Sequence, residues 1–195
     1  MNISGKNIGI ALTGSYCTFD KVFPQIERLV KENANIYTIF SYQSQTTDTR
    51  FGKSADFIKL AKEITGNNPI TTIVEAEELG PNNTLDAVVV APCSGNTLAK
   101  MANAITDSPV LMATKGLLRN NKPVILAVST NDALGNNLKN IGMLINIKNV
   151  YFVPFGQDNY KRKPYSMVAQ FDLILPTIEK ALEGVQIQPI VLAPT

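Results

Sequence analysis

The chain has 195 residues, of which 45% are apolar and 17% charged, and it contains no histidine. This composition is typical of a globular domain and argues against disorder. The net charge of +2 comes from scattered basic and acidic residues and gives no basis for nucleic-acid binding. No apolar run approaches the ~18 residues that span a bilayer, and Met1–Ser4 lacks signal-peptide features. We therefore expect a cytoplasmic protein without a nucleic-acid or membrane partner.

The first half of the chain alternates predicted strands and helices. The patterns predict strands over Asn7–Thr13 and Asn35–Phe40, a helix over Phe19–Asn33 with Pro24 near its first turn, an irregular polar segment over Ser41–Lys53, a helix over Ala55–Thr65 capped by Ser54 and stopped by Gly66, and a short edge strand over Ile70–Val74.

The second half continues the alternation. Its patterns predict strands over Asp86–Ala91, Lys122–Val128 and Asn149–Pro154, and helices from the Ser94–Thr97 loop through Ile105, over Val110–Arg119, over Ala133–Ile147, and over Met167–Glu183 with an interruption near Pro176. Strands separated by helices of this length predict an α/β fold with a doubly wound, mostly parallel sheet. No linker divides the chain, so we expect a single domain over residues 1–195.

The most informative segment is the buried strand Asp86–Ala91 together with the loop and helix after it. Small polar residues form the loop Ser94–Thr97, and a helical pattern starts at once. A strand, a small polar loop and a helix aim free backbone amides and the helix dipole at an anion. Ligands of open α/β sheets bind at the carboxyl ends of the strands. The segment therefore predicts an anion site, with a phosphate as the anion.

Hydroxyl-rich loops come after four of the predicted strands and would share one edge of a parallel sheet. They are Thr13–Ser15, Ser41, the Ser94–Thr97 loop and Ser129–Asn131. Such side chains suit a phosphate held without a metal. Ser, Thr and Asn also cap helices, which is the alternative interpretation for any one loop. Four such loops on one edge favour a ligand.

Several common sites are excluded by the sequence. No G-x-G-x-x-G comes after the first strand, so the usual dinucleotide fingerprint is absent. The lack of histidine removes serine–histidine and cysteine–histidine catalysis and histidine metal ligands. Cys17 and Cys93 are too few for a zinc site, and we interpret both as small fillers or loop residues. Chemistry must come from a bound cofactor or from Asp, Glu, Lys, Tyr and Cys; no residue is assigned as catalytic and no metal is expected.

Three motifs resemble the homo-oligomeric FMN-binding flavoproteins, which include phosphopantothenoylcysteine decarboxylase, lantibiotic cysteine decarboxylases and flavin prenyltransferase. They are Thr13-Gly14-Ser15, Ser41 and the run Ala91-Pro92-Cys93-Ser94-Gly95-Asn96-Thr97-Leu98-Ala99-Lys100, after which comes Ala102-Asn103-Ala104-Ile105-Thr106-Asp107. The resemblance implies a Rossmann-like flavoprotein fold, a homo-oligomer and bound FMN. It also implies the FMN-binding residues Gly14, Ser15, Ser41, Ser94, Asn96 and Thr97.

Further segments resemble one branch of this family, found in spore-forming bacteria. They are Asp48–Gly52, Ser129–Gly135 and Pro154–Asp158. The resemblance implies a role in sporulation, in the mother-cell cytoplasm. There the chain would act with an NADP-dependent A subunit, with NADP on that partner, to oxidise a dihydrodipicolinate-type precursor to dipicolinate. The missing histidine argues against cysteine decarboxylation.

The resemblance also suggests substrate-binding residues. Asn131 matches an asparagine of the decarboxylases that contacts a substrate carboxylate, although Val128 and Thr130 stand where that motif has proline and methionine. Tyr160 and Arg162 are similar to a Tyr-x-Arg-Pro region near the substrate in flavin prenyltransferase, with one extra residue before the proline. A solvated basic loop is the alternative there. Arg50 is a second candidate for binding a dicarboxylate.

Three functions fit these residues. The first is the oxidoreductase subunit just described. The second is another FMN-dependent enzyme of the family, a transferase or a decarboxylase. The third is a non-catalytic partner subunit that binds an anion. Yellow colour separates the third from the other two, and activity without a partner separates the second from the first.

Overall fold

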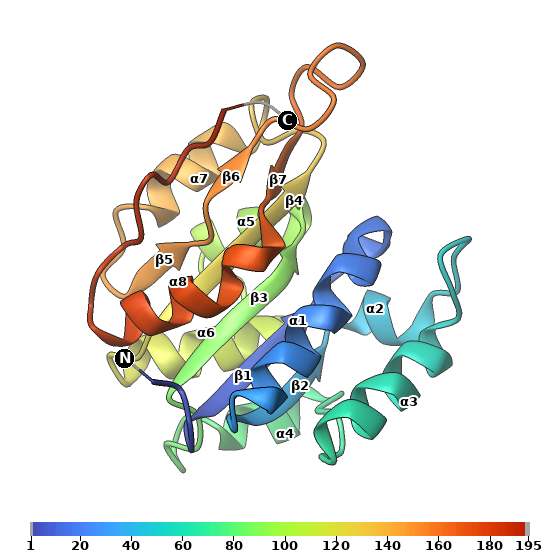
Figure 1. Cartoon of the computed structure of the whole chain (residues 1–195), viewed down its shortest axis with the longest axis vertical. Helices are drawn as coiled ribbons and strands as arrows, with labels where there is room; N and C mark the ends of the chain where they lie inside the picture. The colour runs from blue at the N-terminus through green and yellow to red at the C-terminus, as the bar shows by residue number, and fades with distance from the viewer. Residues whose placement is uncertain (1, 194–195) are drawn as a thin grey trace.

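The structure is a computed structural model, and the description covers residues 2–193. One sheet runs through its centre in the order β2-β1-β3-β4-β7-β6, and β5 pairs with the first half of β4 (Figure 1). The strands are β1 Asn7–Leu12, β2 Asn35–Phe40, β3 Ala87–Cys93, β4 Val124–Thr130, β5 Val150–Phe152, β6 Phe155–Gly156 and β7 Met167–Ala169. β1 to β5 pair in parallel, whereas β7 is antiparallel to both β4 and β6. The predicted mostly parallel α/β sheet is confirmed.

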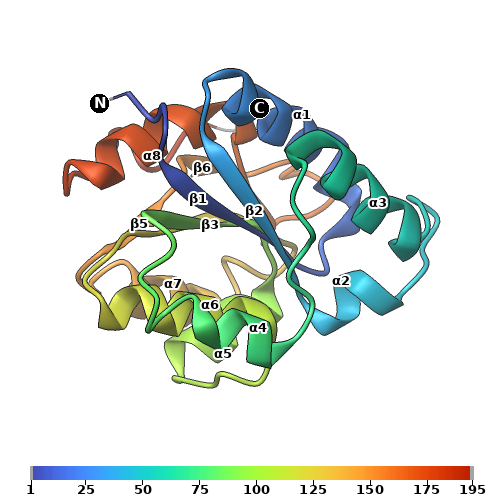
Figure 2. The same cartoon turned by 90° about the horizontal axis from the view of Figure 1, so that it is seen from below.

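Helices cover both faces of the sheet, as a doubly wound fold requires. Figure 2 shows α1, α3 and α8 on one side of the sheet and α4, α5, α6 and α7 on the other. The helices are α1 Phe19–Lys31, α2 Tyr42–Thr46, α3 Ser54–Thr65, α4 Ile73–Glu78, α5 Gly95–Ala102, α6 Pro109–Arg119, α7 Leu138–Leu144 and α8 Ile174–Leu182. Within residues 2–193, none of these helices is long and apolar enough to cross a membrane.

The core is built on β3, the strand that the sequence marks as buried on both faces. All seven of its residues are buried, including the consecutive Val88, Val89 and Val90. Burying one such side chain is worth about 1.5–3 kcal/mol. β1 and β4 flank β3 in parallel, so the carboxyl ends of the three strands point to the same edge of the sheet.

The sequence predicted an irregular polar segment after β2, but part of this segment is a helix. Tyr42–Thr46 forms α2, which lacks the apolar periodicity that would reveal a helix. It starts because the Ser41 side chain accepts a hydrogen bond from the Ser44 amide. The predicted cap of the next helix is also corrected. Ser54 lies inside α3, the cap position is Lys53, and the Ser54 hydroxyl donates to Asp48 instead.

Two predicted elements are of the wrong type. Ile70 makes one parallel bridge with Ile39, but the expected edge strand is replaced by α4, which starts in a capping box between Thr72 and Glu75. The expected helix over Met167–Glu183 divides into β7, a 3₁₀ turn at Phe171–Leu173, and α8. β7 pairs with the end of β4, at Ser129 and Thr130, because β5 pairs with β4 only as far as Leu126.

Two predicted helices differ in detail. Pro24 lies in the interior of α1, not near its start, and removes one hydrogen bond to the carbonyl of Asp20. The helix expected over Ala133–Ile147 is confined to Leu138–Leu144, because residues 131–136 form turns beside the end of β4.

Candidate functional site

Three helices begin around one cavity at the carboxyl edge of the sheet. Ser41, Ser94 and Ser108 cap α2, α5 and α6, each by accepting a hydrogen bond from an amide in the first helical turn. All three serines line a cavity of about 420 Å³. We name it the three-helix cavity, and its other lining residues are Thr13, Gly14, Tyr42, Gln43, Asn96, Thr97, Lys100, Asp107 and Leu111.

Hydrogen bonds between the loops fix this cavity. The Thr13 hydroxyl donates to the Pro92 carbonyl at 2.6 Å and accepts from the Ser94 amide at 3.1 Å, which joins the loop after β1 to the loop after β3. The Ser94 and Thr97 hydroxyl oxygens lie 3.0 Å apart. The amides of Gly95 and Asn96 are in the first turn of α5, where an α-helix provides no acceptor. They are therefore available to an anion.

The charge of the three-helix cavity is balanced. Its lining residues include one cation and one carboxylate, Lys100 and Asp107, and these pair at 2.7 Å. The remaining polar groups are hydroxyls, amides and helix starts. Helix N-termini attract negative charge, so three of them around a neutral cavity suit a phosphate group.

A larger cavity of about 600 Å³ adjoins the first, and we name it the central cavity. The two share Gly14 and Ser94. Ser15 lines the central cavity and donates to the Ser129 carbonyl at 2.7 Å, which ties the loop after β1 to the end of β4. Tyr16 also lines it and donates its hydroxyl to the Gln43 carbonyl.

Asp132 forms part of the central cavity's wall beside the start of α5. One carboxylate oxygen accepts from Thr130 at 2.5 Å and the other from Asn137 at 2.8 Å. Gly95 makes this close approach possible. A Cβ at Gly95 would lie 2.6 Å from the Thr130 hydroxyl and 2.9 Å from the Asp132 carboxylate, too near for either atom to stay in place.

The loop after β6 contributes a second cluster of polar side chains to the wall of the central cavity, centred on Asp158. Asp158 accepts a short hydrogen bond from Ser166 and lies 3.6 Å from the Lys163 ammonium. Ser166 is buried and also reaches the Asn131 side-chain oxygen at 3.4 Å. Asn131, Asp158 and Lys163 all line the cavity.

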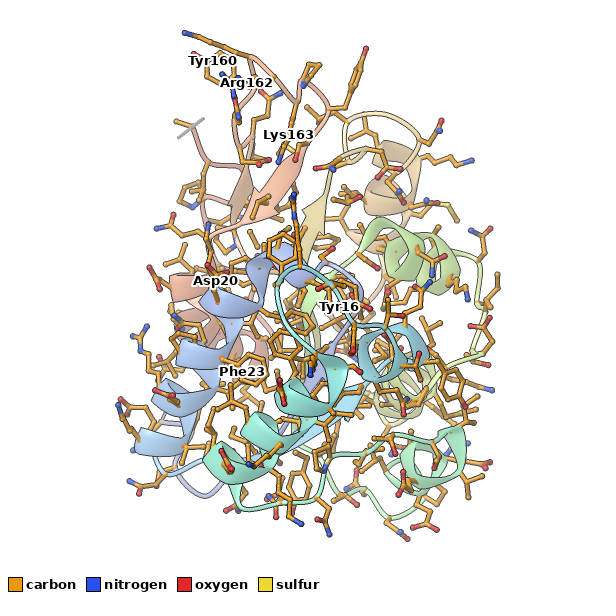
Figure 3. The ribbon with its side chains drawn as sticks, turned by 90° about the vertical axis from the view of Figure 1, so that its right-hand side faces the viewer. Tyr16, Asp20, Phe23, Tyr160, Arg162 and Lys163 are labelled. Carbon is orange, nitrogen blue, oxygen red and sulfur yellow. The ribbon has the colours of Figure 1, made fainter. Side chains whose placement is uncertain are left out.

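The structure brings most of the predicted site residues together. Gly14, Ser15, Ser41, Ser94, Asn96, Thr97 and Asn131 all line one or both of these two adjoining cavities. Arg50 does not, although its neighbours Thr49 and Phe51 do; its guanidinium carbon lies 4.8 Å from the centre of the Phe51 ring. Tyr160 and Arg162 lie on a projecting loop, above Lys163 in Figure 3, and line neither cavity.

Sequence reasoning missed several residues that line these cavities. Lys21 comes from α1, and Lys100 and Asp107 lie beyond the polar loop that drew attention to α5. No motif marks Lys21, which reaches its cavity through the packing of α1, whereas Lys100 and Asp107 lie in segments that resemble the flavoproteins but were assigned no role. Asp132 and Asp158 had a signal, because both lie within segments that resemble the branch found in spore-forming bacteria.

The cysteines have different environments. Cys17 is exposed and lines the central cavity, whereas Cys93 is buried in the last position of β3. Burial raises the pKa of the Cys93 thiol well above its usual range, so this thiol is not a nucleophile at neutral pH. Within residues 2–193, no group of Cys, Asp and Glu side chains is arranged to hold a metal ion.

The sheet and its hydroxyl-lined edge define the class of protein. The profile of the Flavoprotein family matches residues 1–175, and the chain belongs to this family. It is 52% identical over 191 residues to the B subunit of dipicolinate synthase of Bacillus subtilis (strain 168), covering 98% of this chain and 96% of that protein. The crystal structure of the corresponding dipicolinate synthase chain from Bacillus halodurans superposes with a TM-score of 0.92 at 49% identity, over the full length of both chains.

More distant solved structures share the fold. The FMN-dependent cysteine decarboxylase SpaF superposes with a TM-score of 0.67 over 94% of this chain and 99% of that one, at 16% identity. The two proteins therefore share a fold over nearly their whole length, although their sequences have little in common.

Proposed function

We propose that the chain is the flavoprotein subunit of a dipicolinate synthase. In this proposal it works with an NADP-dependent A subunit to oxidise a dihydrodipicolinate-type precursor to dipicolinate in the cytoplasm of the sporulating cell. The identity of 52% to the Bacillus subtilis protein supports this assignment, because it covers almost all of both chains. We also propose that residues 1–195 form one domain, supported by the single hydrophobic cluster that spans all the main strands.

The residues of the edge fit FMN. The phosphate would lie in the three-helix cavity, where Ser41, Ser94 and Thr97 offer hydroxyls and the amides of Gly95 and Asn96 have no helical acceptor. Gly14 and Ser94, shared by both cavities, would lie beside the ribityl chain, and Ser15 beside the ring system. The observation that carries the proposal is the convergence of three capped helix starts on one cavity without net charge.

FMN held by these residues would supply two-electron redox chemistry, taking a hydride equivalent from the precursor and passing it to the NADP of the A subunit. The chain's own part is binding, orientation and the exclusion of water in the central cavity. Asn131 lines that cavity and would hold a substrate carboxylate. Arg50, Tyr160 and Arg162 lie outside it; we propose that the two arginines attract the anionic substrate towards the cavity and that Tyr160 offers it a hydroxyl donor there.

An apolar groove supports a homo-oligomer. It has a volume of about 450 Å³ and is formed by α5, α6 and α7 with Met101, Ile105, Leu118, Leu144 and Ile147 among its lining residues. Ile105 and Ile147 are at least 40% exposed. Leu111 lines both this groove and the three-helix cavity. A second copy covering the groove would therefore pack next to the wall of the phosphate end of the site.

The test begins with purified protein and an absorbance scan. We expect a flavin spectrum with about one FMN per chain, and dipicolinate formation with NADPH production only after the A subunit is added. Turnover without the A subunit would favour a transferase or decarboxylase. A colourless protein that takes up no added FMN would contradict the flavoprotein proposal and favour a non-catalytic subunit.

A further inference from the structure

The central cavity has two distinct ends. One end adjoins the three-helix cavity at Gly14 and Ser94. The other adjoins a third cavity of about 490 Å³, the side cavity, with which it shares Lys21, Asp158 and Val168. If FMN enters with its phosphate in the three-helix cavity, a molecule that reacts with it must bind towards the second end. A role for the second end in substrate binding therefore rests on the proposed function.

Lys21 lies at this second end without a charged partner. It is in the first turn of α1, is exposed to solvent, and lines both the central and the side cavity. No ion pair joins it to any other residue that the structure describes, from position 2 to position 193. An unpaired ammonium at a junction between two cavities is available to an anionic ligand.

Lys163 approaches the same end from a different element. It lies in the loop after β6, as Tyr160 and Arg162 do, and Figure 3 shows it nearer the body of the molecule than those two residues. Its ammonium lies 3.6 Å from Asp158, a separation beyond a good hydrogen bond. Asp158 is itself held by Ser166. Lys163 can therefore turn to a ligand carboxylate without moving the aspartate.

The two carboxylates of the central cavity are unevenly placed. Asp132 lies at the first end, because a Cβ on Gly95 would come within 2.9 Å of its oxygen. Thr130 and Asn137 already donate to it. Within the central cavity, the second end thus has two cations, Lys21 and Lys163, against one carboxylate, Asp158. The side cavity beyond it adds Asp172, whose carboxylate accepts a hydrogen bond from Gln25. The excess of positive charge within the central cavity suits an anion, and two cations on separate elements suit two acidic groups.

We infer that Lys21 and Lys163 bind the two carboxylates of a ring dicarboxylate at the second end of the central cavity and select it over a monocarboxylate. One lysine comes from α1 and the other from the loop after β6, so a rigid ring with acidic groups on either side of its nitrogen can meet both. A monocarboxylate can meet only one. These lysines are positioning and specificity residues, distinct from Arg50 and Arg162, which line neither end.

The experiment measures binding of dipicolinate and of picolinate, which has a single carboxylate, to FMN-loaded protein by titration calorimetry. The variants are Lys21→Met and Lys163→Met. Matched controls are Lys31→Met, at the far end of α1, and Lys161→Met, two residues from Lys163 but outside the cavities. We expect each test variant to lose dipicolinate affinity by about tenfold and to lose the preference for dipicolinate.

Flavin absorbance of each variant is measured separately, so that the two proposals fail differently. Unchanged dipicolinate affinity in both test variants, or an equal loss in the controls, would overturn the lysine pair. Wild-type protein that holds FMN but does not prefer dipicolinate to picolinate would overturn it as well, while leaving the flavin assignment intact. Failure to hold FMN would count against the proposed function, and the same titrations on the flavin-free chain would still test the lysines.

Discussion

At the residue scale, one hydroxyl side chain at the carboxyl edge of the sheet can both cap a helix and donate a hydrogen bond to a ligand. The Ser94 oxygen accepts from the Thr97 amide, and this leaves its hydroxyl hydrogen free for the Thr97 oxygen or for a phosphate. The capping interpretation and the ligand interpretation of the sequence are therefore compatible. In a capping serine, one lone pair of the hydroxyl oxygen serves the helix. At a cavity wall, the other lone pair and the hydroxyl hydrogen face the cavity and can bind a ligand.

Thr97→Val tests this double role. The variant keeps the shape of the side chain and removes the hydroxyl that lies 3.0 Å from Ser94. We expect FMN affinity to fall about tenfold, with a stability loss of about 1 kcal/mol, because the Ser94 hydroxyl loses its partner. FMN titration by fluorescence quenching measures the affinity.

Thr65→Val is the control, because its hydroxyl donates to the Ala61 carbonyl within α3, outside the cavities of the site. FMN affinity that is unchanged in Thr97→Val, or equally reduced in the control, would show that Thr97 does not contact the phosphate.

At the element scale, the sequence reveals those elements whose own pattern decides their structure. β1, β2 and β3 were predictable because each is a mostly apolar run bounded by polar residues, and β3 is buried on both faces along its whole length. α2 was missed because a serine cap, not an apolar stripe, starts it. β7 was predicted as helix because its three residues become a strand only through pairing with β4, which is distant in sequence.

The same distinction explains how much of the site could be predicted. Ser15, Ser41, Ser94 and Thr97 were visible because parallel strands bring their loops to one edge, whereas Ser108 caps a helix that does not follow a strand and was not predicted. Lys21 was not visible, because the packing of α1 alone takes it to a cavity. The positions of Tyr160 and Arg162 depend on how far their loop projects, which a motif does not encode (Figure 3).

Gly95 and Gly142 provide a matched pair of helical glycines. We expect Gly95→Ala to destabilise the protein by about 1–3 kcal/mol and to weaken FMN binding, because a Cβ would lie 2.6 Å from the Thr130 hydroxyl. Gly142→Ala in α7 should be neutral or stabilising by up to about 1 kcal/mol, since nothing lies within 4 Å of its Cβ position. Urea unfolding compares the two, and equal effects would refute the close packing at the start of α5.

The capping box of α4 predicts a dependence of stability on pH. Amide and hydroxyl donors from Thr71 and Thr72 hold the pKa of Glu75 below its ordinary value of 4.5. The carboxylate therefore stabilises the folded state above that value, and this contribution disappears as the pH falls through the lowered pKa.

Glu75→Gln should cost about 0.5 kcal/mol at pH 7, a small value because the group is exposed. The cost should shrink as the pH falls below 4.5 and disappear as the pH passes through the lowered pKa. Chemical unfolding of both proteins at several pH values measures this, and a penalty that persists in acid would contradict the electrostatic explanation.

At the scale of the whole molecule, the three-helix cavity and the apolar groove are neighbours. The cavity and the groove meet at Leu111, so cofactor binding and assembly would be linked.

We expect Ile105→Glu, within the groove, to lower the oligomeric state and to weaken FMN binding. Val74→Glu on α4, exposed but outside the groove, should do neither. Light scattering after gel filtration measures the mass, and an unchanged mass in Ile105→Glu would remove the groove as an interface.

The most direct test compares FMN with riboflavin, which differs from it by the phosphate alone. If hydroxyls and free amides at three helix starts hold that phosphate, FMN should bind at least about 100-fold more tightly than riboflavin, and Thr97→Val should reduce the difference. Equal affinities for the two flavins, measured by titration of the flavin-free protein, would contradict a phosphate site at these helix starts.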